Sequence, residues 1–161
     1  MFDLTHELKP LMGLYAWSAR RTHGSFLTLQ FGEPRLSIRQ PLTSSRSARR
    51  RLVRAVGQWE IWIEQAVWRL DWGAGSVTSD DDQPVIEQAL INLDGQALTD
   101  FRNDETARAS SFHFDLGAVL SVSPDGSADE PQWHLSHHQQ WIASYMNDGR
   151  VEVQRVDTTA R

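Results

Sequence analysis

The chain lacks cysteine entirely, which removes a set of structural and chemical options. A protein without cysteine has no disulfide bonds, no thiolate ligands for a metal and no cysteine nucleophile. A chain of 161 residues can bury enough apolar surface to fold without such crosslinks. We therefore expect a protein that is stabilised by its core alone and fits a reducing compartment.

Long apolar runs are also missing, and the first residues, Met1 to Glu7, lack the basic start and apolar stretch of a secretory signal. The sequence therefore predicts a cytoplasmic protein with no membrane partner. It also contains no GxSxG or HExxH motif, no phosphate-binding glycine loop and no dinucleotide fingerprint. These absences favour a non-enzymatic protein without a cofactor, although they do not exclude an enzyme. No catalytic residue is assigned.

Charge is distributed unevenly along the chain. Residues 1–56 carry ten Lys/Arg and three Asp/Glu, a net charge of +7, whereas residues 57–161 carry six and eighteen, a net charge of −12. Such a split can mark surfaces that bind partners of opposite charge. It can also mean that the two regions lie side by side and neutralise each other within the fold.

A repeated order of residues indicates an internal duplication. Residues 25–38 read SFLTLQFGEPRLSI, and residues 110–122 read SSFHFDLGAVLSV, with the same alternation and a glycine at the same place. A leucine-x-glycine precedes each segment, and a tryptophan-x-aliphatic follows it. We predict two tandem copies, residues 1–79 and 80–156, packed as one compact domain with an approximate two-fold axis. Residues 157–161 are expected to form a frayed tail.

The spacing of apolar residues predicts the elements of each copy. Alternation predicts strands at 27–31 and 112–116, each returning through a hairpin to a strand at 36–39 or 119–123. Further strands are predicted at 58–63 paired with 66–72, at 132–135 paired with 139–145, and at 150–156 after the turn Asn147-Asp148-Gly149. A short helix opens each copy, at 4–11 and at 84–93. The predicted fold class is α+β, mainly antiparallel β, in which a helix plus β-meander unit occurs twice.

An insertion at residues 43–56 has no counterpart in the second copy. Ser44 or Ser45 could cap a short helix there. The arginines of the insertion are Arg46, Arg49, Arg50, Arg51 and Arg54. They could contact phosphate groups, but the sequence contains no helix-turn-helix, zinc-finger or ribonucleoprotein motif. We expect a solvated helix face and no nucleic-acid partner.

Seven tryptophans are a high content for this length, and four of them lie within residues 59–72 on both faces of the predicted strand pair. They cannot all enter one core, so some could line a groove that binds a partner. The candidate partner-binding residues are Trp59, Trp62, Trp68, Trp72, Asp80, Asp81 and Asp82. A second apolar layer would also account for the tryptophans, and capping of the second helix would account for the acidic triplet.

A metal site is an alternative, because several histidines fall in the second copy. His113 and Asp115 are two residues apart on one strand, and His134 points outward from another. Zinc or iron could bind such a set. Nothing in the sequence places the two strands side by side, so solvated histidines without a metal are the expectation.

The strings LDGQAL, SFHFDLGAVLSV and QWHL, between Leu93 and Leu135, resemble small uncharacterised bacterial proteins, some of them similar to immunity proteins encoded beside secreted toxins. The shared residues are packing residues, so the resemblance implies no catalytic residue. With the acidic region and the tryptophans, it favours a non-enzymatic protein-binding module, such as an immunity-like inhibitor of a basic partner. The alternatives are a metal-dependent enzyme that uses His113, Asp115 and His134, and an oligomeric structural or accessory protein.

Overall fold

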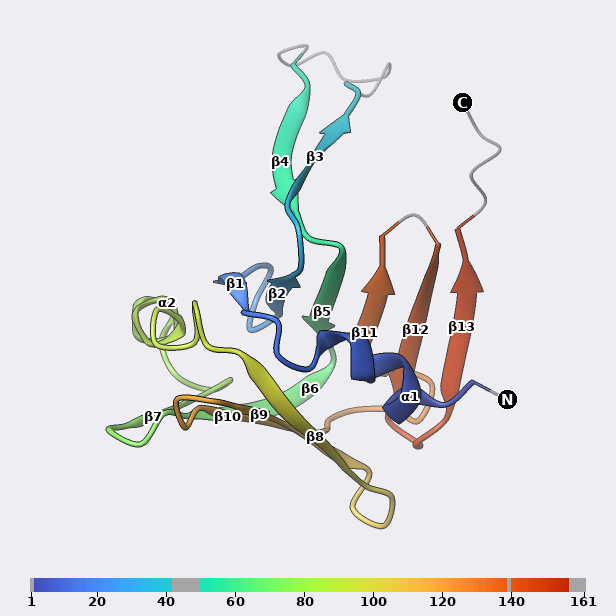
Figure 1. Ribbon diagram of the computed structural model, residues 1–161. Helices are drawn as coiled ribbons and strands as arrows, with labels where there is room; N and C mark the ends of the chain where they lie inside the picture. Colours follow the sequence, from blue (N-terminus) through green and yellow to red (C-terminus); the bar gives the residue numbers. More distant parts are fainter. Residues whose placement is uncertain (1, 42–49, 139, 157–161) are drawn as a thin grey trace.

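The computed structural model describes residues 2–41, 50–138 and 140–156, and Figure 1 shows their arrangement. Within these residues the fold is mainly antiparallel β with two short α-helices, as the sequence predicted. A six-stranded and a five-stranded sheet share one apolar core, and a two-stranded ribbon extends away from both. None of the described helices is long and apolar enough to cross a membrane.

The six-stranded sheet combines strands from both ends of the chain. Its order is β1 (Trp17–Arg21), β2 (Leu27–Phe31), β5 (Trp59–Ile63), β11 (Pro131–His137), β12 (Trp141–Met146) and β13 (Val151–Arg155), and all neighbours are antiparallel. The predicted turn Asn147-Asp148-Gly149 joins β12 to β13. Residues far apart in sequence, such as Ile61 and Leu135, face each other across β5 and β11.

The five-stranded sheet has the order β7 (Ser76–Thr78), β6 (Ala66–Asp71), β10 (Val119–Pro124), β9 (Ala109–Phe114) and β8 (Leu98–Asp104). Strands β5 and β6 therefore lie in different sheets, and the predicted pairing of 58–63 with 66–72 is wrong. The reason is local. The amides of Glu64 and Gln65 donate to Gln132 O at 2.8 Å and Pro131 O at 3.0 Å, so the chain follows β11 to its start before it crosses to the other sheet.

Strands β3 (Arg35–Arg39) and β4 (Leu52–Val56) form the two-stranded ribbon, called the arm here, which rises above the body in Figure 1. Strand β2 does not form the predicted hairpin with 36–39, because β1 and β5 occupy both of its edges. Residues 52–56, expected within a helix, pair with β3 as a strand instead. Ser44, Ser45, Arg46 and Arg49 lie outside the described residues, as does the tail at 157–161.

The helices form close to where they were predicted. Helix α1 (Leu4–Leu8) is capped by Asp3, whose carboxylate accepts hydrogen bonds from the amides of Thr5 and His6, and it continues into the 3-10 turn η1 (Lys9–Leu11). Helix α2 (Gln83–Leu90) carries Pro84 in its first turn, where a missing amide proton costs nothing. Its Ile86, Ala89 and Leu90 face the core. Both helices therefore cover apolar strand faces.

The burial of side chains along β2 and β9 can be compared with the predicted alternation. Phe112 and Phe114 are buried and His113 between them is only partly covered, which confirms the predicted faces at these positions; β9 ends at Phe114, however, and Leu116, predicted within the strand, is exposed in the turn. On β2 all five residues are buried, including the outward-facing Gln30. The Gln30 amide group is satisfied there, because Nε2 donates to Glu60 at 2.6 Å and Oε1 accepts from the Gly57 amide at 2.9 Å.

A short antiparallel bridge connects the two leucine-x-glycine segments. Tyr15 pairs with Ala97, and the glycine amides on either side donate across the pair: Gly13 N to Leu98 O and Gly95 N to Ala16 O, each at 2.7 Å. Both glycines have a φ of +85°, a left-handed conformation that favours glycine. The bridge ties the segment after η1 to the segment after α2.

Candidate functional site

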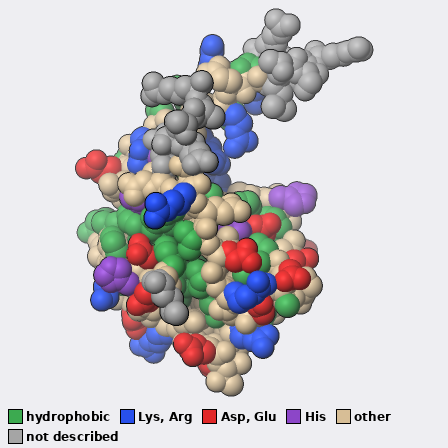
Figure 2. Space-filling model, turned by 90° about the vertical axis from the view of Figure 1, so that its right-hand side faces the viewer, with side chains coloured by type: hydrophobic (Ala, Val, Ile, Leu, Met, Phe, Trp, Pro, Cys, Tyr) green, Lys and Arg blue, Asp and Glu red, His purple; other side chains and the backbone are tan. Residues whose placement is uncertain are grey.

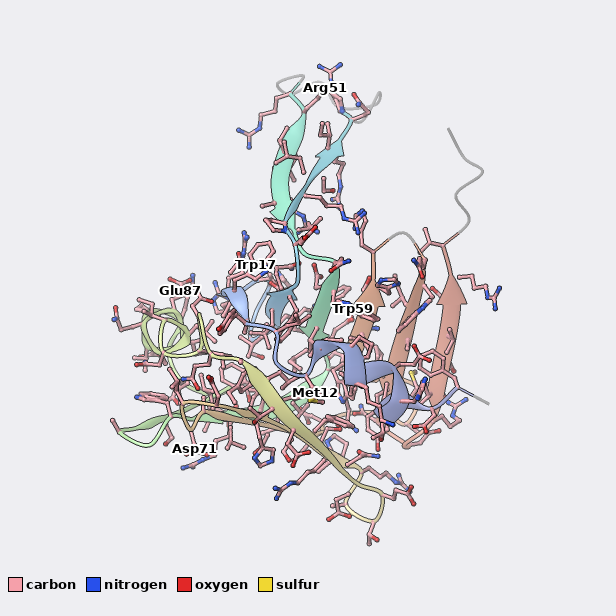
Figure 3. All side chains as sticks on the ribbon, in the orientation of Figure 1. Met12, Trp17, Arg51, Trp59, Asp71 and Glu87 are labelled. Atoms are coloured by element: carbon pink, nitrogen blue, oxygen red, sulfur yellow. The ribbon has the colours of Figure 1, made fainter. Side chains whose placement is uncertain are left out.

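Two of the four candidate tryptophans belong to the core. Trp68 is enclosed, and its indole N–H donates to the carbonyl oxygen of Ser25 at 2.7 Å. Trp59 lies on the inner face of β5 and stacks on the imidazole of His137, with ring centres 4.1 Å apart. Figure 3 shows Trp59 among the strands of the six-stranded sheet. These two side chains hold the fold together and present no surface to a partner.

The other two tryptophans lie on different surfaces. Trp62 is 36% exposed on the outer face of β5, where its ring centre lies 5.0 Å from that of His134. Trp72 follows β6 in the five-stranded sheet and packs beside α2. The structure therefore does not bring the four tryptophans into one groove. It leaves a single tryptophan on each of two faces.

Trp72 does line a groove, which runs along α2. The groove has a volume of about 540 Å³ and is lined by Trp72, Pro84, Val85, Gln88, Ala89 and Asn92. Val85 is largely exposed at its rim. Most of these groups are apolar, and the two amide side chains supply polar contacts. Such a surface can take an apolar side chain of another molecule together with hydrogen-bonding groups.

The acidic triplet stands at the start of the same helix. Asp80, Asp81 and Asp82 are all exposed, two to four residues before Pro84 at the groove. Asp82 is the N-cap residue, but its side chain accepts no capping hydrogen bond. Asp81 instead accepts from the Thr78 amide at 2.7 Å and so orders the turn that precedes the helix. The triplet therefore places negative charge at one end of the groove.

The three residues of the alternative metal site do not lie together. His113 is on β9 of the five-stranded sheet and shares a hydrogen bond of 2.9 Å with the hydroxyl of Ser111. Asp115 accepts from the Ala97 amide at 2.8 Å, while His134 is on β11 of the six-stranded sheet. Among residues 2–41, 50–138 and 140–156, no three His, Asp or Glu side chains lie close enough together to hold a metal ion.

His134 belongs instead to a hydrogen-bonded chain that the sequence did not reveal. Its Nδ1 lies 2.8 Å from Ser144 Oγ, and its Nε2 lies 2.7 Å from Glu64 Oε2. A hydroxyl, an imidazole and a carboxylate in this order can activate a serine nucleophile. Ser144, however, lies in the middle of β12, whose backbone pairs with β11 and β13 on both sides. We therefore interpret these hydrogen bonds as cross-strand contacts that fix the His134 side chain beside Trp62.

The arm carries a bare apolar face and an opposite basic face. Leu36 pairs with Ala55 and Ile38 pairs with Val53, so these four side chains project from one face. Leu36 and Ile38 are 69% and 55% exposed. The other face presents Arg35, Arg39 and Arg54. Figure 2 shows the arm standing clear of the body, and Arg51 is labelled at its outer end in Figure 3.

Comparison of the chain with protein-family models, with curated proteins and with solved structures finds no match in any of the three.

Proposed function

We propose that the protein is a non-enzymatic protein-binding module whose α2 groove takes a basic partner. The observation that carries this proposal is the combination of Trp72, exposed Val85 and the acidic triplet around one groove. Tryptophan in a groove is a frequent energetic centre of protein interfaces, and flanking charge selects and orients the partner. An immunity-like inhibitor of a basic toxin is the specific form of this function that we favour.

The overall charge supports a basic partner. Residues 35–54 carry seven of the sixteen basic residues and no acidic residue. The remainder has nine basic and all twenty-one acidic residues, a net charge of −12. A body with this charge attracts basic proteins over distances of about a Debye length and accelerates their association.

The proposal is tested with purified products of neighbouring genes, each measured for binding to the full chain. For the partner that binds, the variant Asp80→Asn/Asp81→Asn/Asp82→Asn is expected to lower the association rate constant about tenfold at low salt, because it removes the steering charge at the groove. Asparagine keeps the hydrogen-bonding oxygen of Asp81, so the turn should remain formed.

A matched control is Glu33→Gln/Glu105→Gln/Asp125→Asn, which removes three exposed charges outside the groove. It should change the association rate constant by less than about threefold. Equal losses in the two variants would show that net charge alone acts, and the absence of any binding partner would leave the proposed function without support.

A second candidate, an oligomeric structural or accessory protein, is favoured by the apolar face of the arm. An isolated two-stranded ribbon is only marginally stable in water, and packing of Leu36 and Ile38 against another molecule would stabilise it. If copies of the chain associate through this face, sedimentation should show an oligomer that dissociates in the variant Leu36→Ser/Ile38→Ser. A monomer at all concentrations, for both proteins, would exclude this candidate.

We also propose that the two halves arose by duplication, and the strand orders support this. One sheet combines β1-β2-β5 with β11-β12-β13, and the other combines β8-β9-β10 with β6-β7, so each half contributes to both sheets. The Tyr15–Ala97 bridge pairs positions that are equivalent in the two halves. On this proposal β5 corresponds to β10 and the whole arm is the insertion, so residues 36–38 and 120–122, which match in sequence, are not equivalent in the structure. An experimental structure in which β1-β2-β5 does not superpose on β8-β9-β10 would contradict it.

A further inference from the structure

The arm and the six-stranded sheet enclose a small polar cleft between them. The cleft has a volume of about 160 Å³, and its polar lining residues are Ser37, Arg54, Glu60, Ser136 and His138. Ser37 and Arg54 face each other across β3 and β4, and Glu60 and Ser136 face each other across β5 and β11. Two strand pairs and the segment that follows β11 therefore converge on one place, which shares no residue with the α2 groove.

Positive charge in the cleft is not balanced by ion pairs. Within the described part of the chain, neither Arg54 nor the neighbouring Arg35 forms a salt bridge. Glu60 is the one acidic lining residue, and its carboxylate already accepts a hydrogen bond of 2.6 Å from Gln30 Nε2. Arg54 lines the same cleft as two serine hydroxyls and a histidine, all of which can donate hydrogen bonds.

The pKa of His138 reflects the positive charge around the cleft. Partial burial lowers the pKa of this imidazole from its ordinary value, and the positive charges of Arg35 and His137 lower it further. The carboxylate of Glu60 acts in the opposite direction without cancelling them. Burial penalises an added charge of either sign, whereas the positive charges of Arg35 and His137 favour a negative charge over a positive one.

The size of the cleft limits what can enter it. Pockets that hold drug-sized ligands or nucleotides have volumes of roughly 300–1,000 Å³, so about 160 Å³ is too small for them. One tetrahedral or planar oxyanion group fits this space. Arginine presents its donors in a fork that matches the oxygens of phosphate, sulfate or carboxylate.

We propose that this cleft binds a single small oxyanion group, held by the Arg54 guanidinium and the hydroxyls of Ser37 and Ser136. The site does not depend on the proposed protein-binding function, because it lies at the base of the arm and shares no residue with the α2 groove. Inorganic sulfate is the cleanest probe, because its charge stays constant near neutral pH.

The experiment is a titration of the full chain with sulfate at constant ionic strength, followed by NMR. Saturable shifts are expected for the amides of Gly57 and Ser136, and the pKa of His138 should rise when sulfate is bound. By the same linkage, sulfate should bind more tightly as the pH falls through the pKa of His138, since protonation adds a positive charge and a donor. Phosphate and acetate in separate titrations distinguish a tetrahedral from a planar group.

Two arginine variants make the test specific. Arg54→Gln is expected to weaken sulfate binding about tenfold or more, because it removes the bidentate donor. Arg39→Gln removes the same charge from the same face of the arm without touching the cleft, and should leave the affinity nearly unchanged. Equal losses in the two variants, or no saturable shift at tens of millimolar of any of the three anions, would overturn the proposal.

Discussion

Replacement of Trp133 by alanine is expected to lower the free energy of unfolding by roughly 3–5 kcal/mol. Trp133 is 0% exposed and projects from β11 into the space between the two sheets. Its ring contacts Phe101 and Phe112 of the five-stranded sheet and Tyr145 of β12, with ring centres 5.2–5.6 Å apart. Alanine would leave a cavity where the sheets meet.

The loss would include a hydrogen bond. The indole N–H of Trp133 donates to the hydroxyl of Ser110 at 3.1 Å, and both groups are buried. Trp133→Phe keeps an aromatic ring but not this donor, so it should give an intermediate loss and serves as the second variant if Trp133→Ala does not fold.

The matched control is Trp62→Ala, on the neighbouring strand β5 and at 36% exposure on its outer face. This change should cost about 1 kcal/mol or less in urea denaturation, because mainly the contact with His134 is lost. Similar losses for Trp62→Ala and Trp133→Ala would show that the inner and outer faces of the six-stranded sheet have been assigned the wrong way round.

Alternation along the sequence was sufficient to predict the strands that have one buried face, but not their partners. Strands such as β9 and β10 carry uninterrupted period-two patterns and were predicted correctly as a hairpin. Strand β5 was predicted as well, yet its partners β2 and β11 are set by tertiary packing of distant segments. A side-chain pattern records which face is buried and contains no information on which strand lies beside it.

The edge strands β1 and β8 escaped prediction because bulges interrupt their patterns, and the three-residue edge strand β7 was missed as well. The register of β1 shifts between Trp17 and Arg20, where Ser18 has a positive φ, and that of β8 shifts between Leu98 and Asp100. An extra residue exchanges the faces of all following side chains, so one continuous alternation no longer runs along the strand. Exposed charged residues such as Arg102 on β8 further hide the strand.

For the candidate sites, sequence proximity was a weak guide. The tryptophans at 59–72 appeared as one cluster, but the crossing between sheets at Glu64 and Gln65 separates Trp62 from Trp72. The Ser144–His134–Glu64 chain depends on the register of three strands and could not have been foreseen. The apolar face of the arm could have been predicted in part, since Leu36 and Ile38 alternate with arginine and serine; residues 52–56 read LVRAV and show no such alternation.

Gly57, which joins the arm to the six-stranded sheet, is the position where the smallest substitution should have a large effect. A Cβ atom at this position would overlap the carbonyl oxygen of Phe31 and lie 2.9 Å from its amide nitrogen. Phe31 cannot withdraw, because it pairs with Trp59 across β2 and β5. Gly57→Ala is therefore expected to lower the free energy of unfolding by about 2–3 kcal/mol, as overpacking against fixed backbone does.

Gly24→Ala provides the comparison for this effect. Gly24 has a φ of +58° and open space around its Cβ position, so alanine there should cost about 1 kcal/mol from backbone strain alone. Gly57 has no positive φ, and its loss would be purely steric. Urea denaturation of both variants measures the difference. Hydrogen exchange should accelerate at the amides of Phe31 and Trp59 in Gly57→Ala, because the clash separates β2 from β5. If Gly57→Ala lowers the free energy of unfolding no more than Gly24→Ala does, the backbone around Gly57 can move enough to accept a Cβ atom, and the prediction is wrong.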